Sequence, residues 1–81
     1  MKSDKVLTYT VIFEQAVEGG YIATVPALPG CVSQGETFEE ARNNIKDAIG
    51  GYLSVLKEDG DKIPVESPEH IAASVSVSFA V

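Results

Sequence analysis

Alternating apolar and polar positions predict strands in the first half of the chain. Residues 6–13 (VLTYTVIF) are rich in β-branched and aromatic side chains, as a strand should be. A polar loop follows and ends in Glu18-Gly19-Gly20, where paired glycines supply the positive φ angles of a tight reversal. Residues 21–25 then form the second strand of a hairpin. Residues 31–34 return as a short third strand that ends at Gly35.

Two prolines shape the connection between the second and third strands. Pro26 has no N–H group, so the second strand ends there or lies at a sheet edge. Pro29-Gly30 suits the two central positions of a type II turn, because proline presets φ and glycine allows the positive φ that follows. Cys31 then begins the third strand.

The middle of the chain has helical periodicity from Phe38 to about Glu58. Thr37 and Glu40 predict a capping box, in which each side chain accepts from the other residue's backbone N–H. Gly60 is a plausible terminator. Gly50-Gly51 interrupt the helix at a cost of about 1 kcal/mol each; either close packing requires them or the helix tolerates the weakness. The apolar stripe comprises Ala41, Ile45, Ala48, Ile49, Tyr52, Leu53 and Leu56.

Residues 71–81 alternate more cleanly than any other segment, after a proline-containing tether over 61–70. We therefore expect an α+β fold in the order β-β-β-α-β. Its four-stranded mixed sheet would carry the helix on one face, because a right-handed crossover places the last strand beside the first. One face of this last strand holds only Ser and Ala, which permits another sheet or a second copy to approach closely; the alternative is a plain solvent-facing surface.

The composition indicates one small domain over residues 1–81. A net charge of −6 argues against direct binding to nucleic acid and suits a basic protein partner, although it can also serve solubility alone. No apolar run or signal peptide directs the chain to a membrane, so a cytoplasmic location is expected. Because so short a chain builds a thin core, we expect a homo-oligomer formed by sheet pairing or packing.

The inventory of reactive residues predicts a binding protein and not an enzyme. One cysteine and one histidine cannot build an internal disulfide or a metal site of several Cys and His ligands. Cys31 is expected to be a structural, half-buried thiol, and His70 an exposed residue of the tether. The first strand lacks the internal carboxylates of a two-metal nuclease. No phosphate-binding or dinucleotide motif is present, so we predict no catalytic residue, metal or cofactor.

The segment YIATVPALPGCVSQGETFEEA, residues 21–41, closely resembles the signature of HicB-type antitoxin domains. That signature runs from an aromatic residue through a V-P-x-L-P-G-C turn to a G-x-T-x-x-E-A helix start. The resemblance extends over nearly the whole chain. It implies a partial RNase H-like topology without nuclease activity. It also implies a role in binding and blocking a small RNA-cleaving toxin of the HicA type.

One departure from the family and two residue sets complete the prediction. Many family members carry a C-terminal DNA-binding segment, and this chain shows none. An alternative is therefore an orphan self-assembling scaffold or regulatory module without a toxin partner. The acidic cluster beside the signature turn is the candidate partner-binding site: Glu36, Glu39 and Glu40. The residues expected to maintain the motif's structure are Pro26, Pro29, Gly30, Gly35 and Thr37.

Overall fold

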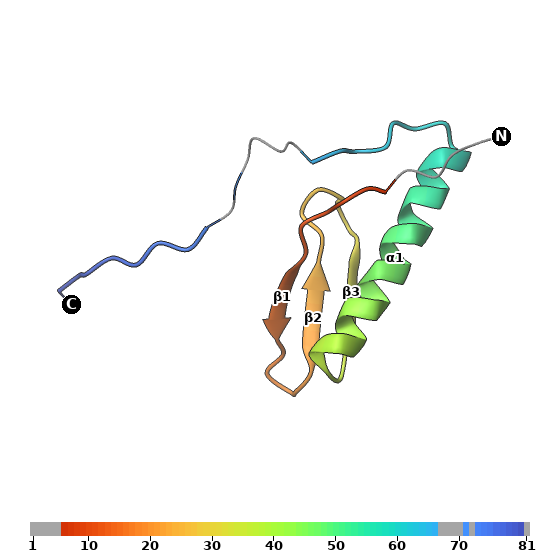
Figure 1. Cartoon of the computed structure of the whole chain (residues 1–81). Helices are drawn as coiled ribbons and strands as arrows, with labels where there is room; N and C mark the ends of the chain where they lie inside the picture. Colours follow the sequence, from red (N-terminus) through yellow and green to blue (C-terminus); the bar gives the residue numbers. More distant parts are fainter. Residues whose placement is uncertain (1–5, 67–70, 72, 81) are drawn as a thin grey trace.

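The computed structural model describes residues 6–66, 71 and 73–80, which contain three strands and one helix (Figure 1). The strands form one antiparallel sheet in the order β1-β2-β3, and the helix follows them along the chain. Ala23 of the central strand lies opposite Phe13 of β1 and Ser33 of β3. The elements are β1 (Ile12–Gln15), β2 (Tyr21–Thr24), β3 (Val32–Gly35) and α1 (Phe38–Glu58).

The glycine and proline positions set the turns as the sequence predicts. Gly19 and Gly20 have φ angles of 103° and 79° and reverse the chain between β1 and β2. Gly30 has a φ of 82°, and the Cys31 N–H donates to the Leu28 carbonyl at 2.9 Å. This is the geometry of a type II turn centred on Pro29-Gly30.

The helix begins and ends at the predicted residues. The Thr37 hydroxyl accepts from the Glu40 N–H at 3.0 Å. The second half of the expected capping box was wrong in one detail, since the Glu40 carboxylate accepts from the N–H of Glu36, at 3.1 Å, instead of from that of Thr37. At the other end Gly60 has a φ of 73°, and the Asp61 N–H donates to the Leu56 carbonyl at 2.8 Å. These bonds close the helix as a Schellman-type cap.

The core lies between α1 and one face of the sheet. α1 packs over β3 and β2, and its buried Ile45 meets side chains from the sheet and from the turn after β2. The opposite face of the sheet has no helix among the described residues (Figure 1). A small domain covered on one side keeps a thin core. The buried apolar residues are Ala23, Val25, Leu28, Cys31, Ala41 and Ile45.

The expected fourth strand is absent from the described residues, so the four-stranded mixed sheet and its partial RNase H-like topology were wrong predictions. The described part of segment 71–80 forms no strand and is exposed throughout, extending away from the sheet (Figure 1). Alternation favours an extended strand, but it does not specify which edge pairs with it. The first strand was also misplaced: β1 starts at Ile12, and residues 6–11 approach it without ladder pairing.

Candidate partner-binding surface

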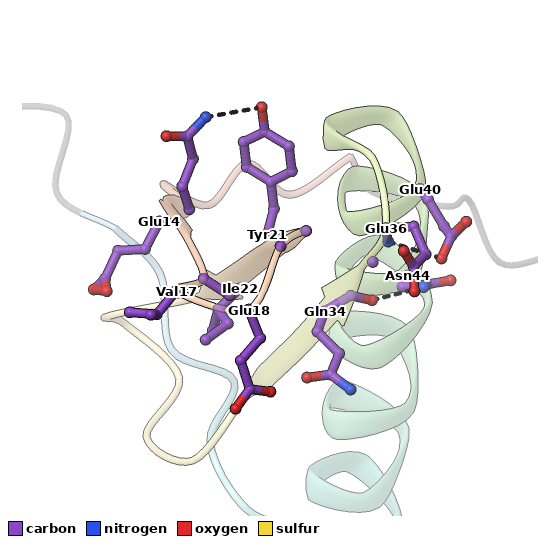
Figure 2. A pocket seen from close by; sticks show the side chains of 14 residues that line it. Glu14, Val17, Glu18, Tyr21, Ile22, Gln34, Glu36, Glu40 and Asn44 are labelled. Atoms are coloured by element: carbon purple, nitrogen blue, oxygen red, sulfur yellow. Dashed lines mark hydrogen bonds between the residues drawn. The ribbon is translucent and has the colours of Figure 1, made fainter.

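An acidic hollow lies where the β1–β2 turn, the end of β3 and the start of α1 meet (Figure 2). We define it by its four carboxylates, Glu14, Glu18, Glu36 and Glu40, which come from three different parts of the chain. Its fourteen lining residues include neither Lys nor Arg. Like charges gathered without a counter-charge favour the approach of a cation or a basic partner.

The fold holds the two flanks of the hollow together. A Cβ built on Gly20 would lie 2.7 Å from the Gly35 carbonyl oxygen, so the β1–β2 turn is in close contact with the end of β3. The Asn44 side-chain amide donates to the Gln34 carbonyl at 2.8 Å, which ties the second turn of α1 to β3 (Figure 2). Together with the bond from the Glu36 N–H to Glu40, these contacts fix the helix start against the sheet.

The structure places only part of the predicted acidic cluster in this hollow. Glu36 and Glu40 line it, whereas Glu39 lies on the exposed first turn of α1 outside the lining. Sequence reasoning missed Glu14 and Glu18. The signal was available in the hairpin, because Glu14 and Gln34 both lie opposite Ile22 in the ladder and so share one row of the sheet.

The uncovered face of the sheet continues the hollow as an apolar surface. Register places Ile12, Thr24 and Val32 in one row across the three strands. Ile22 lies on the same face and also lines the hollow. Ile12 is 51% exposed and Val32 55% exposed, so large apolar groups face solvent here. We call Ile12, Ile22 and Val32 the open sheet face; with the acidic hollow beside it, it has the apolar centre and charged border of a protein interface.

The remaining predicted residues have structural surroundings. Pro26, Pro29 and Gly30 lie in exposed positions of the two turns between β2 and β3. Cys31 is more deeply buried than the half-buried thiol we expected, and burial raises its pKa. A buried thiol with a raised pKa carries little thiolate at neutral pH. Gly35 is pressed against the backbone of Ala41 and Thr37 caps α1.

The described residues hold no cluster of typical metal ligands. They contain no group of three or more His, Cys, Asp or Glu side chains placed to hold a metal ion. His70 lies outside the described residues. Within the described part of the chain, α1 is too polar to cross a bilayer, and no other helix could do so.

Comparison with known proteins assigns the family. Residues 9–78 match the model of the HicB_like antitoxin of bacterial toxin-antitoxin systems. A UPF0150 protein of Thermoplasma acidophilum is 48% identical over 65 residues, which cover 80% of this chain and 94% of that protein. Antitoxin HicB 1 of Photorhabdus laumondii is 34% identical over 80 residues, covering 95% of this chain and 52% of the relative.

Antitoxin HicB of Escherichia coli is 37% identical over 62 residues, covering 76% of this chain and 45% of the relative. The chain thus spans about half the length of the two relatives that carry the antitoxin name, and most of the length of the UPF0150 protein. The family model covers the whole β1-β2-β3-α1 unit, including the residues of the acidic hollow. The chain belongs to the HicB-like antitoxin family.

Proposed function

We propose that this domain is an antitoxin that binds and blocks a small RNA-cleaving toxin of the HicA type. The observation that carries the proposal is the acidic hollow beside the open sheet face, on a domain of an antitoxin family. The proposed role is one of binding and not of catalysis, and it uses the acidic hollow and the open sheet face.

The charge of the hollow suits this partner. A protein that cleaves RNA presents Lys and Arg to the phosphates of its substrate. The four carboxylates of the hollow, on β1, the β1–β2 turn, the β3–α1 connection and the start of α1, carry negative charge as the phosphates do. A basic toxin surface paired with them would be unable to hold RNA. Charge complementarity also accelerates association, which helps an antitoxin act before the toxin finds RNA.

The open sheet face supplies the apolar part of the proposed contact. Burial of apolar area contributes roughly 25 cal/mol per Å², whereas exposed ion pairs contribute little each. Ile12, Ile22 and Val32 would therefore carry most of the affinity, and the acids would set orientation and partner choice. We include Glu36, Glu39 and Glu40 in the contact, with Glu14 and Glu18 added. Val17, fully exposed at the β1–β2 turn, extends it.

A matched pair of valines tests the apolar part. Val32 is 55% exposed on the open sheet face, whereas Val65 is 75% exposed in the segment after α1 and lines neither the acidic hollow nor the open sheet face. Val32→Lys should raise the Kd for a HicA-type toxin, measured by calorimetry, at least tenfold, which corresponds to a loss of about 1.4 kcal/mol of binding free energy. Val65→Lys should leave the Kd within about twofold, because Val65 lies outside the proposed contact.

A second pair of variants tests the charges. Glu14→Lys combined with Glu18→Lys should weaken binding and flatten its dependence on salt. The control, Asp47→Lys combined with Glu58→Lys, changes the net charge equally on exposed positions of α1. Failure of the chain to bind any HicA-type protein, including one encoded beside it, would refute the proposal. Equal effects of the two pairs would refute the assigned surface.

We also propose that the chain forms a homo-oligomer, the state expected for a self-assembling module. The supporting observation is the apolar segment 71–80, whose described residues remain exposed in a single copy. Light scattering tests this: a strict monomer at tens of micromolar would overturn self-assembly and leave toxin binding untouched.

A further inference from the structure

We propose that two copies of the domain meet along the outer edge of β3, where their sheets pair and their α1 helices lie side by side. The three strands of each copy would then form one continuous sheet. The inference rests on the proposed self-association and gives it a surface within the β1-β2-β3-α1 unit. It makes no use of the segment after α1.

The outer edge of β3 presents backbone groups at Val32. The Val25 N–H donates to the Cys31 carbonyl at 3.1 Å, so the Cys31 carbonyl faces β2. Direction alternates along a strand, and the N–H and carbonyl groups of Val32 and Gln34 therefore face away from β2. The Asn44 amide, which reaches the Gln34 carbonyl from α1, agrees with this direction. Among the described strands β3 pairs only with β2, so this edge is free.

Side chains of α1 occupy one end of the edge and leave the other end open. The Gln34 carbonyl accepts from Asn44 at 2.8 Å, and two residues farther on the Glu36 N–H donates to the Glu40 carboxylate at 3.1 Å. Another strand would have to compete for these groups. The open end is centred on Val32. A two-fold axis there lets the Val32 N–H of each copy donate to the Val32 carbonyl of the other, as in an antiparallel ladder.

An apolar groove lies between the open end of the edge and α1, on the β3 side of the molecule (Figure 1). From the helix it is lined in part by Ala48, Gly51 and Val55. Val55 is 56% exposed, so a large apolar group is left uncovered in a single copy. With Asn44 these residues are spaced four, three and four apart, which places them on one stripe of the helix. This spacing suits contact with a second helix.

Gly51 lies at the centre of the stripe and gains nothing from its own copy. Glycine weakens a helix interior, and a Cβ at Gly51 would meet nothing within 4 Å. A two-fold axis through Val32 keeps both helices on one face of the joined sheet and makes them antiparallel. The glycines of the two copies then face each other, and the missing Cβ atoms allow the helix backbones to approach closely.

Charge favours a second copy as the occupant of this groove. Each chain carries a net charge of −6, so two copies repel each other wherever their acids meet. The eight residues that line the groove include no charged side chain. The axis through Val32 also turns the two acidic hollows toward opposite ends of the joined sheet, and it sets Glu58 of one helix against Asn44 of the other. A basic partner, by contrast, finds no opposite charge in this groove.

A matched pair of glycine substitutions in the full-length chain tests the helix contact. Gly51→Gln fills the centre of the stripe and should raise the Kd of the dimer, measured by light scattering over a dilution series, about tenfold or more. Gly50→Gln makes the same change one position away, off the stripe, and should leave the Kd within about twofold. Glutamine is the better helix former, so both variants should fold, as circular dichroism would show. Equal effects of the two substitutions would refute the helix contact.

Hydrogen exchange at the Val32 amide tests the strand pairing. In the dimer this N–H is bonded to the other copy, and its exchange followed by NMR should be about tenfold slower or more than in the Gly51→Gln monomer. Exchange of the Val32 amide at the same rate in the dimer and in the monomer would refute the pairing. An unmodified chain that stays monomeric at tens of micromolar would overturn the self-association together with this interface. A dimer that persists unchanged in Gly51→Gln would overturn the interface alone.

Discussion

Gly35→Ala should be the most destabilising of the simple glycine substitutions in this domain. Gly35 ends β3 where the helix start crosses it, and its φ is not positive, so backbone conformation alone would admit alanine. The obstacle is space. An added Cβ would lie 2.4 Å from the Ala41 nitrogen and 2.8 Å from the Glu40 carbonyl carbon. Both are backbone atoms and cannot rotate away.

The size of the effect follows from the required movement. Ordinary contact begins at 3.4 Å, so the start of α1 would have to retreat by about 1 Å. Overpacking of this kind costs about 1–3 kcal/mol. The retreat would also strain the bonds from Asn44 to Gln34 and from Glu36 to Glu40, each contributing about 1 kcal/mol. A total of about 2–5 kcal/mol compares with roughly 4–10 kcal/mol for the free energy of unfolding of a small domain.

Gly50→Ala is the matched control, since it makes the same chemical change where space is open. A Cβ on Gly50 or on Gly51 meets nothing within 4 Å, so the described residues give no close packing that would require either glycine. Alanine there should raise the free energy of unfolding by about 0.5–1 kcal/mol through helix propensity.

Urea unfolding followed by circular dichroism at 222 nm measures both variants. With a slope of about 1 kcal/mol per molar urea, the midpoint should fall by about 2 M or more for Gly35→Ala and rise slightly for Gly50→Ala. Equal midpoints for Gly35→Ala and the unmodified chain would refute the steric argument. A loss of stability in Gly50→Ala would show that this glycine is packed against something, such as a second copy.

Two further predictions concern the helix cap and the thiol. Thr37→Ala should lower the free energy of unfolding by about 1 kcal/mol in the same urea assay, and Thr37→Ser should recover most of it because serine keeps the hydroxyl that accepts from Glu40. Burial raises the pKa of Cys31, so its stabilising contribution is complete below the unfolded thiol's pKa of about 8.5 and is lost as pH rises through the folded pKa. The free energy of unfolding should therefore fall at alkaline pH, and it should fall less steeply in Cys31→Ala. An identical fall in the two proteins would refute this reasoning.

The sequence was most informative where local chemistry decides the structure. Thr37 and Gly60 mark the ends of α1, and Pro29-Gly30 marks a turn, because caps and turns depend on a few neighbouring residues. The position of β1 was less accessible. Residues 6–13 alternate uniformly, but ladder pairing is set by the turn at Gly19-Gly20, which places Gln15 opposite Tyr21. Pairing therefore extends back from that turn only to Ile12.

The candidate site was predicted in part for the same reason. Glu36 and Glu40 are close along the helix start, so sequence proximity was enough to group them. Glu14 and Glu18 join them only through the ladder and the contact between Gly20 and Gly35, which no local pattern expresses. The error at residues 71–81 arose because a local pattern was present but the pairing expected from it was not. Alternation favours an extended conformation but specifies no pairing partner, and the described part of this segment forms no strand.

Strand alternation separates the two faces of this small sheet, so that one packs against α1 and the other is open to a partner. Ala23 points toward α1 and is fully buried, whereas its neighbours Ile22 and Thr24 point to the uncovered face. Substitutions on the open sheet face that keep the backbone N–H should therefore change partner binding with little effect on stability. A domain with so few buried side chains can keep these surfaces independent only while its register holds, because a slip of one residue would exchange Ala23 for Ile22 in the core.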